Sequence, residues 1–96
     1  MTVWFVSRHP GALEWAARQG IVYDRQAAHL DASQVAAGDK VIGSLPVHLA
    51  AEICARGAEY WNLSLDLKSV DRGRELSADE LQRSNARTER FVVHKY

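Results

Sequence analysis

The pattern of hydrophobic and polar positions divides the first half of the chain into short strands and one helix. Residues 2–6 are β-branched or aromatic on both faces, which is typical of a buried central strand. After a proline, the helix formers of residues 12–19 lead to Gly20, a usual helix stop. Residues 21–23 and 40–45 are predicted as the second and third strands, with a less regular region between them.

In the second half, the pattern predicts a helix, a strand, a second helix and a final strand. A helix is expected over residues 47–56, between Pro46 and Gly57, with an apolar stripe. Residues 60–67 alternate strictly, with an apolar face of Trp61, Leu63, Leu65 and Leu67 and a polar face of Tyr60, Asn62, Ser64 and Asp66. Such a strand is half-buried, so its polar face should contact solvent, a partner subunit or a ligand.

The C-terminal elements follow a charged loop over residues 68–74. A capping box at 77–80 should start a helix that runs toward Arg87, and residues 91–93 should form the last strand. The order β-α-β-β-α-β-α-β predicts a single α/β domain over residues 1–96, with three Rossmann-like layers and a mainly parallel sheet. No G-x-G-x-x-G dinucleotide fingerprint follows the first strand.

Composition narrows the partners of this domain. The 96 residues contain 12 basic and 12 acidic side chains, so the formal net charge is zero, which argues against a polymeric nucleic acid as main ligand. Cys54 is alone, so no intramolecular disulfide is expected. The apolar N-terminal stretch is too short for a signal peptide, and no segment is long enough to span a bilayer. We expect a cytoplasmic, soluble protein without a membrane partner.

Candidate chemistry lies where the predicted strands end. Ser7, Arg8 and His9 follow the first strand and Ser44 the third, each shortly before a proline that starts a helix. Ligands of open parallel sheets bind beyond the carboxyl ends of strands, and helix starts favour phosphate. Arg8 adds a permanent charge and His9 a group that exchanges protons near neutral pH. The further binding candidates at strand ends and helix starts are Gly11, Gly43, Ser64 and Asp66.

Ordinary structural roles compete with these assignments. Ser7 can be a helix cap, Arg8 a surface ion-pair partner, and His9 a structural hydrogen-bonding group. Arg72 and Arg74 flank a glycine and would either close over a phosphate or form a solvated loop. His48 and Glu52 have a spacing compatible with metal ligation, but no third ligand accompanies them, so neither metal nor cofactor is predicted.

At these same positions the chain resembles a known family. Four segments carry the resemblance, which covers most of the chain: Trp4 to Ala16, Gly43 to Ala51, Leu63 to Leu67 and Arg72 to Ser77. Their order and spacing are similar to the small CRISPR-associated Csx-sixteen family of type III CRISPR systems. The resemblance implies a Rossmann-like domain, related in layout to CARF sensor domains, that acts as a homodimer.

The activity that this resemblance implies is that of a ring nuclease. Such an enzyme linearises cyclic tetra-adenylate, the second messenger, by metal-independent attack of a ribose 2′-hydroxyl on the adjacent phosphate. In this assignment Arg8 stabilises charge and His9 transfers protons. Ser7, Ser44 and Ser64 contact phosphate or ribose, and Arg72 and Arg74 form a clamp.

Three other functions remain open from the sequence. The chain would also fit a protein that sequesters cyclic oligoadenylate without cutting it, because both functions need the same contacts. A phosphohistidine-type phosphatase also has Arg-His after its first strand, but followed by glycine where this chain has Pro10. The last alternative is a partner-binding subunit of a CRISPR complex.

Overall fold

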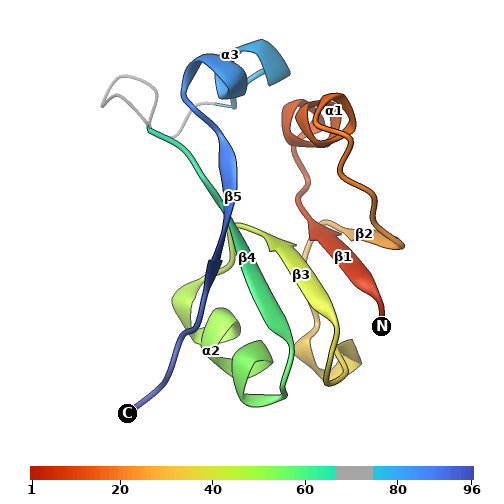
Figure 1. The fold of residues 1–96 in the computed structure, drawn as a ribbon, viewed down its shortest axis with the longest axis vertical. Coiled ribbons are helices and arrows are strands. Elements are labelled where there is room, and N and C mark those ends of the chain that lie inside the picture. Colours follow the sequence, from red (N-terminus) through yellow and green to blue (C-terminus); the bar gives the residue numbers. More distant parts are fainter. Residues whose placement is uncertain (67–74) are drawn as a thin grey trace.

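The structure is a computed structural model that describes residues 1–66 and 75–96, and it contains one twisted sheet with helices packed against it (Figure 1). In chain order the elements are β1 (Val3–Val6), α1 (Pro10–Arg18), β2 (Arg25–Ala27), the 3₁₀ helix η1 (Ala32–Gln34), β3 (Lys40–Gly43), α2 (Val47–Ala55), β4 (Glu59–Ser64), α3 (Ala78–Arg83) and β5 (Arg87–Phe91). The predicted α/β class is confirmed.

The five strands lie in the order β2-β1-β3-β4-β5. The first four are parallel, and β5 pairs antiparallel with β4. The sheet is therefore mostly parallel, as expected. Its order differs from the 3-2-1-4-5-6 order of dinucleotide-binding Rossmann domains, and η1 is an element that the sequence-based order did not contain.

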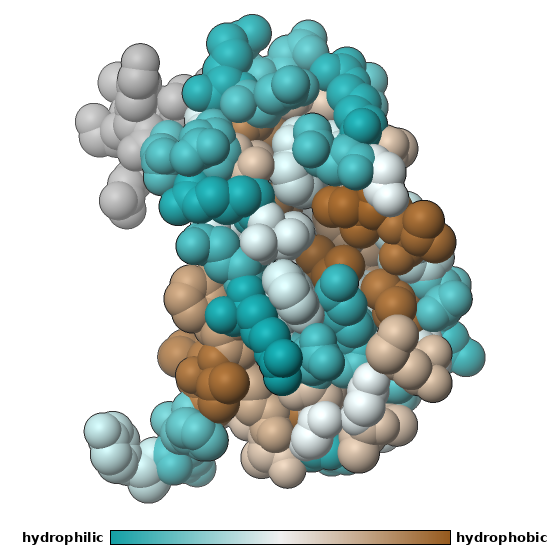
Figure 2. All heavy atoms as spheres, viewed as in Figure 1, coloured by the Kyte–Doolittle hydropathy of each residue, from teal (hydrophilic) through white to brown (hydrophobic). Residues whose placement is uncertain are grey.

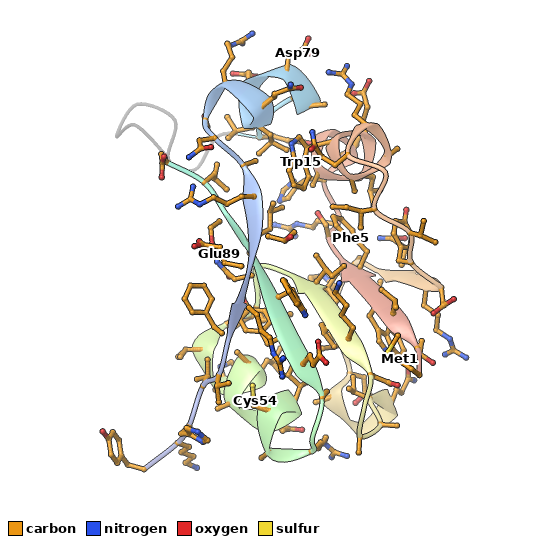
Figure 3. The ribbon with its side chains drawn as sticks, in the orientation of Figure 1. Met1, Phe5, Trp15, Cys54, Asp79 and Glu89 are labelled. Carbon is orange, nitrogen blue, oxygen red and sulfur yellow. The ribbon has the colours of Figure 1, made fainter. Side chains whose placement is uncertain are left out.

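Two hydrophobic cores cover the two faces of the sheet. Trp4 and Val41 pack with residues of η1 and α2, including Ile53, whereas their chain neighbours Phe5 and Ile42 pack with residues of α1 and α3. Because successive side chains of a strand point to opposite faces, these two clusters lie on opposite sides of one sheet. The fold has three layers, with α1 and α3 on one face and η1 and α2 on the other. Phe5 and Trp15, labelled in Figure 3, both belong to the α1 side.

Strand β2 lies at residues 25–27, so its predicted position at residues 21–23 is wrong. Ile21 and Tyr23 are partly buried and pack against the core, and the Tyr23 ring stacks on Phe5 with 5.3 Å between centroids. The ladder with β1 begins only after the turn at Asp24, whose carboxylate accepts a hydrogen bond from Val3 N at 2.8 Å. In this segment the residues that pack against the core, 21 and 23, are thus not the residues that pair with β1, 25–27.

Strand β5 also begins earlier than expected, at Arg87 instead of residue 91. The capping box at Ser77 and Glu80 is present, but α3 ends at Arg83 and Asn85 turns the chain with a φ of 58°. Polar and charged residues then form most of β5 at the edge of the sheet. Charged edge strands are common because they oppose edge-to-edge association.

A buried carboxylate ties the starts of β1 and β3 together. Asp39 is 4% exposed and accepts hydrogen bonds from Thr2 N at 2.9 Å, Ala36 N at 3.0 Å and Trp4 Nε1 at 3.3 Å. The bond from Ala36 N, followed by that from Thr2 N, lowers the pKa of Asp39 despite its burial. Asp39 is therefore a structural anion at the amino end of the sheet.

Within residues 1–66 and 75–96, no helix has the length and apolar character required to cross a lipid bilayer.

Candidate functional site

A cleft opens at the carboxyl ends of β1 and β3. Strands β1 and β3 are adjacent, but the chain leaves β1 through α1 toward β2 and leaves β3 through α2 toward β4. This reversal is the topological switch point at which open α/β sheets bind ligands. The cleft has a volume of about 480 Å³. Its apolar lining consists of Val6, Ala12, Ala28, Leu30, Leu45, Pro46, Leu49, Leu63, Leu65, Leu76 and Leu81.

The structure brings four of the predicted residues together at this cleft. Ser7, Arg8 and His9 enter from the end of β1, and Ser44 enters from the end of β3. Arg8 is exposed and makes no ion pair or hydrogen bond with side chains of the described ranges. A permanently charged side chain that is not neutralised by a neighbour is suited to an anionic ligand.

Two helices begin beside these residues. Helix α1 starts at Pro10 and α2 at Val47, and neither has an acidic residue in its first turn. The positive ends of both helix dipoles are therefore not offset by carboxylates of their own helix. Together with Arg8 they make the strand-end region favourable to negative charge.

His9 is held between a local turn and a carboxylate. Its backbone N–H donates to Ser7 Oγ at 3.2 Å, so the Ser7 hydroxyl organises the turn and does not cap α1. The His9 Nδ1 atom lies 3.8 Å from Glu75 Oε1, and both side chains are about half exposed. This separation is longer than a hydrogen bond, and it places the carboxylate on the Nδ1 side of the ring, away from Nε2.

Hydrogen bonds fix the loop that carries Ser44. Ser44 Oγ donates to the Leu63 carbonyl at 3.0 Å, and Leu45 N donates to Tyr60 Oη at 3.1 Å. Tyr60 is buried on the α2 side of the sheet and its hydroxyl lies 2.5 Å from Asn62 Oδ1. Burial raises the pKa of the Tyr60 phenol, so the hydroxyl keeps its proton at neutral pH. The end of β3 is therefore anchored to β4.

Ser64 and Asp66 do not line this cleft. Ser64 Oγ accepts a hydrogen bond from Asn62 Nδ2 at 2.7 Å. The Asp66 carboxylate lies 3.2 Å from Arg87 Nη1 and 3.3 Å from Asn85 Nδ2, and the Asn85 bond and then Arg87 lower its pKa. The polar face of β4 is thus occupied partly by its own hydrogen bonds and partly by contacts toward β5.

The two candidate glycines lie beside the cleft and permit close packing. A Cβ atom on Gly11 would lie 2.0 Å from the Leu76 carbonyl oxygen, and one on Gly43 would lie 2.5 Å from the Val6 carbonyl oxygen. Gly11 lets α1 approach the segment before α3, and Gly43 lets β3 approach the end of β1. Their absent side chains explain both positions without a ligand.

Two further pairs of residues were considered from the sequence. Arg72 and Arg74 lie outside the described residues. His48 and Glu52 border a second hollow, between α2 and the C-terminal segment. Over residues 1–66 and 75–96, no three His, Cys, Asp or Glu side chains are grouped as metal ligands.

The sequence reasoning missed two polar residues of the cleft, His29 and Glu75. His29 lies two residues after the end of β2, and the same strand-end argument that identified Arg8 would have identified it if β2 had been placed at residues 25–27. Glu75 precedes α3 and reaches His9 only through the packing of α3 beside α1, which no local pattern indicates.

Fold and cleft together define a small α/β domain with a mainly apolar cleft at the switch point of its sheet, in which a few polar and charged residues gather. Residues 4–94 match a family model described as "Putative CRISPR-associated protein (Cas_VVA1548)". The chain belongs to this family of CRISPR-associated proteins. Neither the curated proteins nor the solved structures include a match to it.

Proposed function

We propose that the protein is a ring nuclease of the Csx-sixteen type, which binds cyclic tetra-adenylate and linearises it in type III CRISPR defence. The observation that carries the proposal is the convergence of Ser7, Arg8, His9 and Ser44 from two separate strand ends on one cleft. Membership of a CRISPR-associated family supports the same reading. The kinship with Rossmann-like CARF domains is part of this proposal.

The chemistry assigned to the cleft is an intramolecular transesterification. The ribose 2′-oxygen attacks the adjacent phosphorus, a new P–O2′ bond forms, and the P–O5′ bond breaks to leave a 2′,3′-cyclic phosphate. His9 takes the 2′-hydroxyl proton, and the Glu75 carboxylate lies 3.8 Å from its Nδ1 atom. Arg8 faces the charge that develops on the phosphorane, and Ser7 and Ser44 supply hydroxyl contacts to phosphate or ribose. None of these steps requires a metal ion.

A homodimer is the second part of the proposal. A cleft of about 480 Å³ has the size of sites that hold one drug-sized ligand, whereas the ring carries four nucleotides. Two copies around a twofold axis would double the cationic groups and match the symmetry of the ring.

Incubation of the purified protein with labelled cyclic tetra-adenylate in excess chelator tests the proposal. We expect many turnovers per chain and linear products ending in 2′,3′-cyclic phosphate. Stoichiometric protection of an intact ring would instead identify a sequestering protein. Absence of any binding at micromolar ring would favour a partner-binding subunit, and hydrolysis of simple phosphomonoesters would favour a phosphatase.

A further inference from the structure

The pairing of β1 with β2 continues one residue past the end of β1. Val6 is in register with Ala27, Ser7 N donates to the Ala27 carbonyl at 2.9 Å, and Gln26 Nε2 donates to the Ser7 carbonyl at 2.5 Å. Arg8 and His29 each stand two residues beyond the paired residues Val6 and Ala27. Because neighbouring strands lie about 4.8 Å apart, these two positions leave the sheet side by side.

His29 enters the cleft from this edge without a partner. It is exposed, lines the cleft, and makes no hydrogen bond or ion pair within residues 1–66 and 75–96. His9 differs, because Glu75 lies at its Nδ1 atom. The titratable and charged side chains that line the described part of the cleft are Arg8, His9, His29 and Glu75.

The proposed transesterification needs two proton transfers at different places. In an in-line displacement the attacking 2′-oxygen and the leaving 5′-oxygen lie on opposite sides of the phosphorus. One group must accept the 2′-proton while another donates a proton to the 5′-oxygen. The Glu75 carboxylate lies 3.8 Å from His9 Nδ1, whereas His29 has no hydrogen bond or ion pair within the described ranges, so we assign the first role to His9.

We propose that His29 is the general acid of the cleft, a catalytic residue that protonates the 5′-oxygen as the P–O5′ bond breaks. The step is balanced: His9 gains the 2′-proton, His29 gives its proton to the departing 5′-hydroxyl, and the two rings exchange protons with water before the next turnover. The inference rests on the proposed ring nuclease function and names a residue for which that proposal has no role.

A sulfur substitution at the leaving group tests the assignment. In a ring with one bridging 5′-phosphorothiolate link, the P–S5′ bond breaks and the 5′-sulfur departs as a thiolate. A thiolate needs no proton from the enzyme. On the all-oxygen ring, His29→Ala and His29→Gln should each lower the single-turnover rate by about 10² to 10³-fold. On the thiolate link both variants should recover to within a few-fold of the unmodified protein, whereas His9→Ala should stay slow.

The matched control is His94→Ala, which removes an exposed histidine that does not line this cleft. Its rate on both rings should equal that of the unmodified protein, and the melting temperatures of all variants should agree within about 3 °C. The rate–pH profile of the unmodified protein should be bell-shaped, and His29→Ala should lose only its alkaline limb, because the acid must carry a proton.

Two results would overturn the assignment while leaving the ring nuclease intact. One is a His29→Ala rate on the all-oxygen ring equal to that of the unmodified protein. The other is an equal defect of His29→Ala on both rings, which would make His29 a binding group. If the unmodified protein cuts neither ring, the proposed function fails, and the role of His29 fails with it.

Discussion

Two charged side chains at opposite ends of the sheet have opposite environments. Arg8 is exposed at the cleft and unpaired within the described ranges, whereas Asp39 is 4% exposed and surrounded by three N–H donors. A buried charge that is fully hydrogen-bonded is a structural group, and an exposed unpaired charge beside a cleft is available to a ligand. Substitution of Arg8 therefore tests the function, and substitution of Asp39 tests the stability of the fold.

Arg8→Ala should remove most of the cleavage activity without changing the fold. Loss of one group that stabilises transition-state charge lowers the rate by about 10² to 10³-fold. Single-turnover cleavage of the labelled ring measures the effect, and Arg56→Ala is the control, since Arg56 pairs with Glu52 away from the cleft. An unchanged rate in Arg8→Ala would move the catalytic site elsewhere.

Asp39→Asn should destabilise the protein at neutral pH and much less in acid. An amide would turn a donor toward N–H groups that now meet a carboxylate, and unsatisfied buried donors cost roughly 1–3 kcal/mol each, so we expect a loss of about 3 kcal/mol at pH 7. The pKa of Asp39 is lowered in the folded protein, so its ionised form stabilises the fold above about pH 4. That contribution disappears as the pH falls through the lowered pKa.

Urea unfolding at pH 7 and below pH 3 measures this difference. The gap between Asp39→Asn and the unmodified protein should narrow in acid. Glu52→Gln is the control, because Glu52 is exposed and its ion pair with Arg56 is 3.7 Å long. A gap that is the same at both pH values would mean that the charge of Asp39 contributes nothing.

At the scale of elements, the sequence predicts a strand correctly where the buried apolar residues are also the residues that pair in the sheet. β1, β3 and α2 lie close to their predicted ranges because each has a continuous apolar stretch or a clear helical stripe. β2 and β5 were misplaced, since short edge strands are held by backbone pairing and carry polar residues such as Gln26 and Glu89. The same error hid His29, because a residue is recognised at a strand end only when the strand is placed correctly.

The contact between α1 and the segment before α3 predicts a strong effect of Gly11→Ala. The new methyl group would meet the Leu76 carbonyl at 2.0 Å, which forces α1 away from the segment that carries Glu75. We expect a destabilisation of about 2 kcal/mol and a slower cleavage rate. Urea unfolding and ring cleavage measure the two effects.

Gly20→Ala is the comparison for this prediction. Gly20 has a φ of 71° but open space around it, so alanine there should cost only about 1 kcal/mol and leave cleavage unchanged. If Gly11→Ala were no more harmful than Gly20→Ala, the close approach of α1 to Leu76 would not be a constraint.

At the scale of the whole molecule, the zero net charge argues against a polymeric nucleic acid as ligand but not against a small anionic one. The 12 basic and 12 acidic residues argue against a long nucleic acid, yet Arg8 and two histidines still gather at one cleft. Figure 2 shows hydrophilic and hydrophobic residues interspersed over the viewed face, with apolar patches of limited size. What matters for a small anionic ligand is the local arrangement, which the net charge does not report.

The proposed homodimer predicts a molecular mass and a binding stoichiometry. Sedimentation equilibrium should give twice the 10.7 kDa of one chain, and calorimetric titration of Arg8→Ala or a non-cleavable ring should give one ring per two chains. The reason is that a cleft of about 480 Å³ has the size of a site for one drug-sized ligand, whereas the ring carries four nucleotides. A monomer that binds one ring per chain would contradict the dimer while leaving cleavage possible.

The antiparallel direction of β5 has a practical consequence. It brings the C-terminus back to the end of the sheet where β1 begins, as Figure 1 shows. The cleft lies at the carboxyl ends of β1 and β3, so both termini lie away from it. An affinity tag, a fluorophore or a surface tether attached at either terminus would therefore leave the cleft accessible. Immobilised protein and fluorescent fusions are suitable formats for titrating the ring.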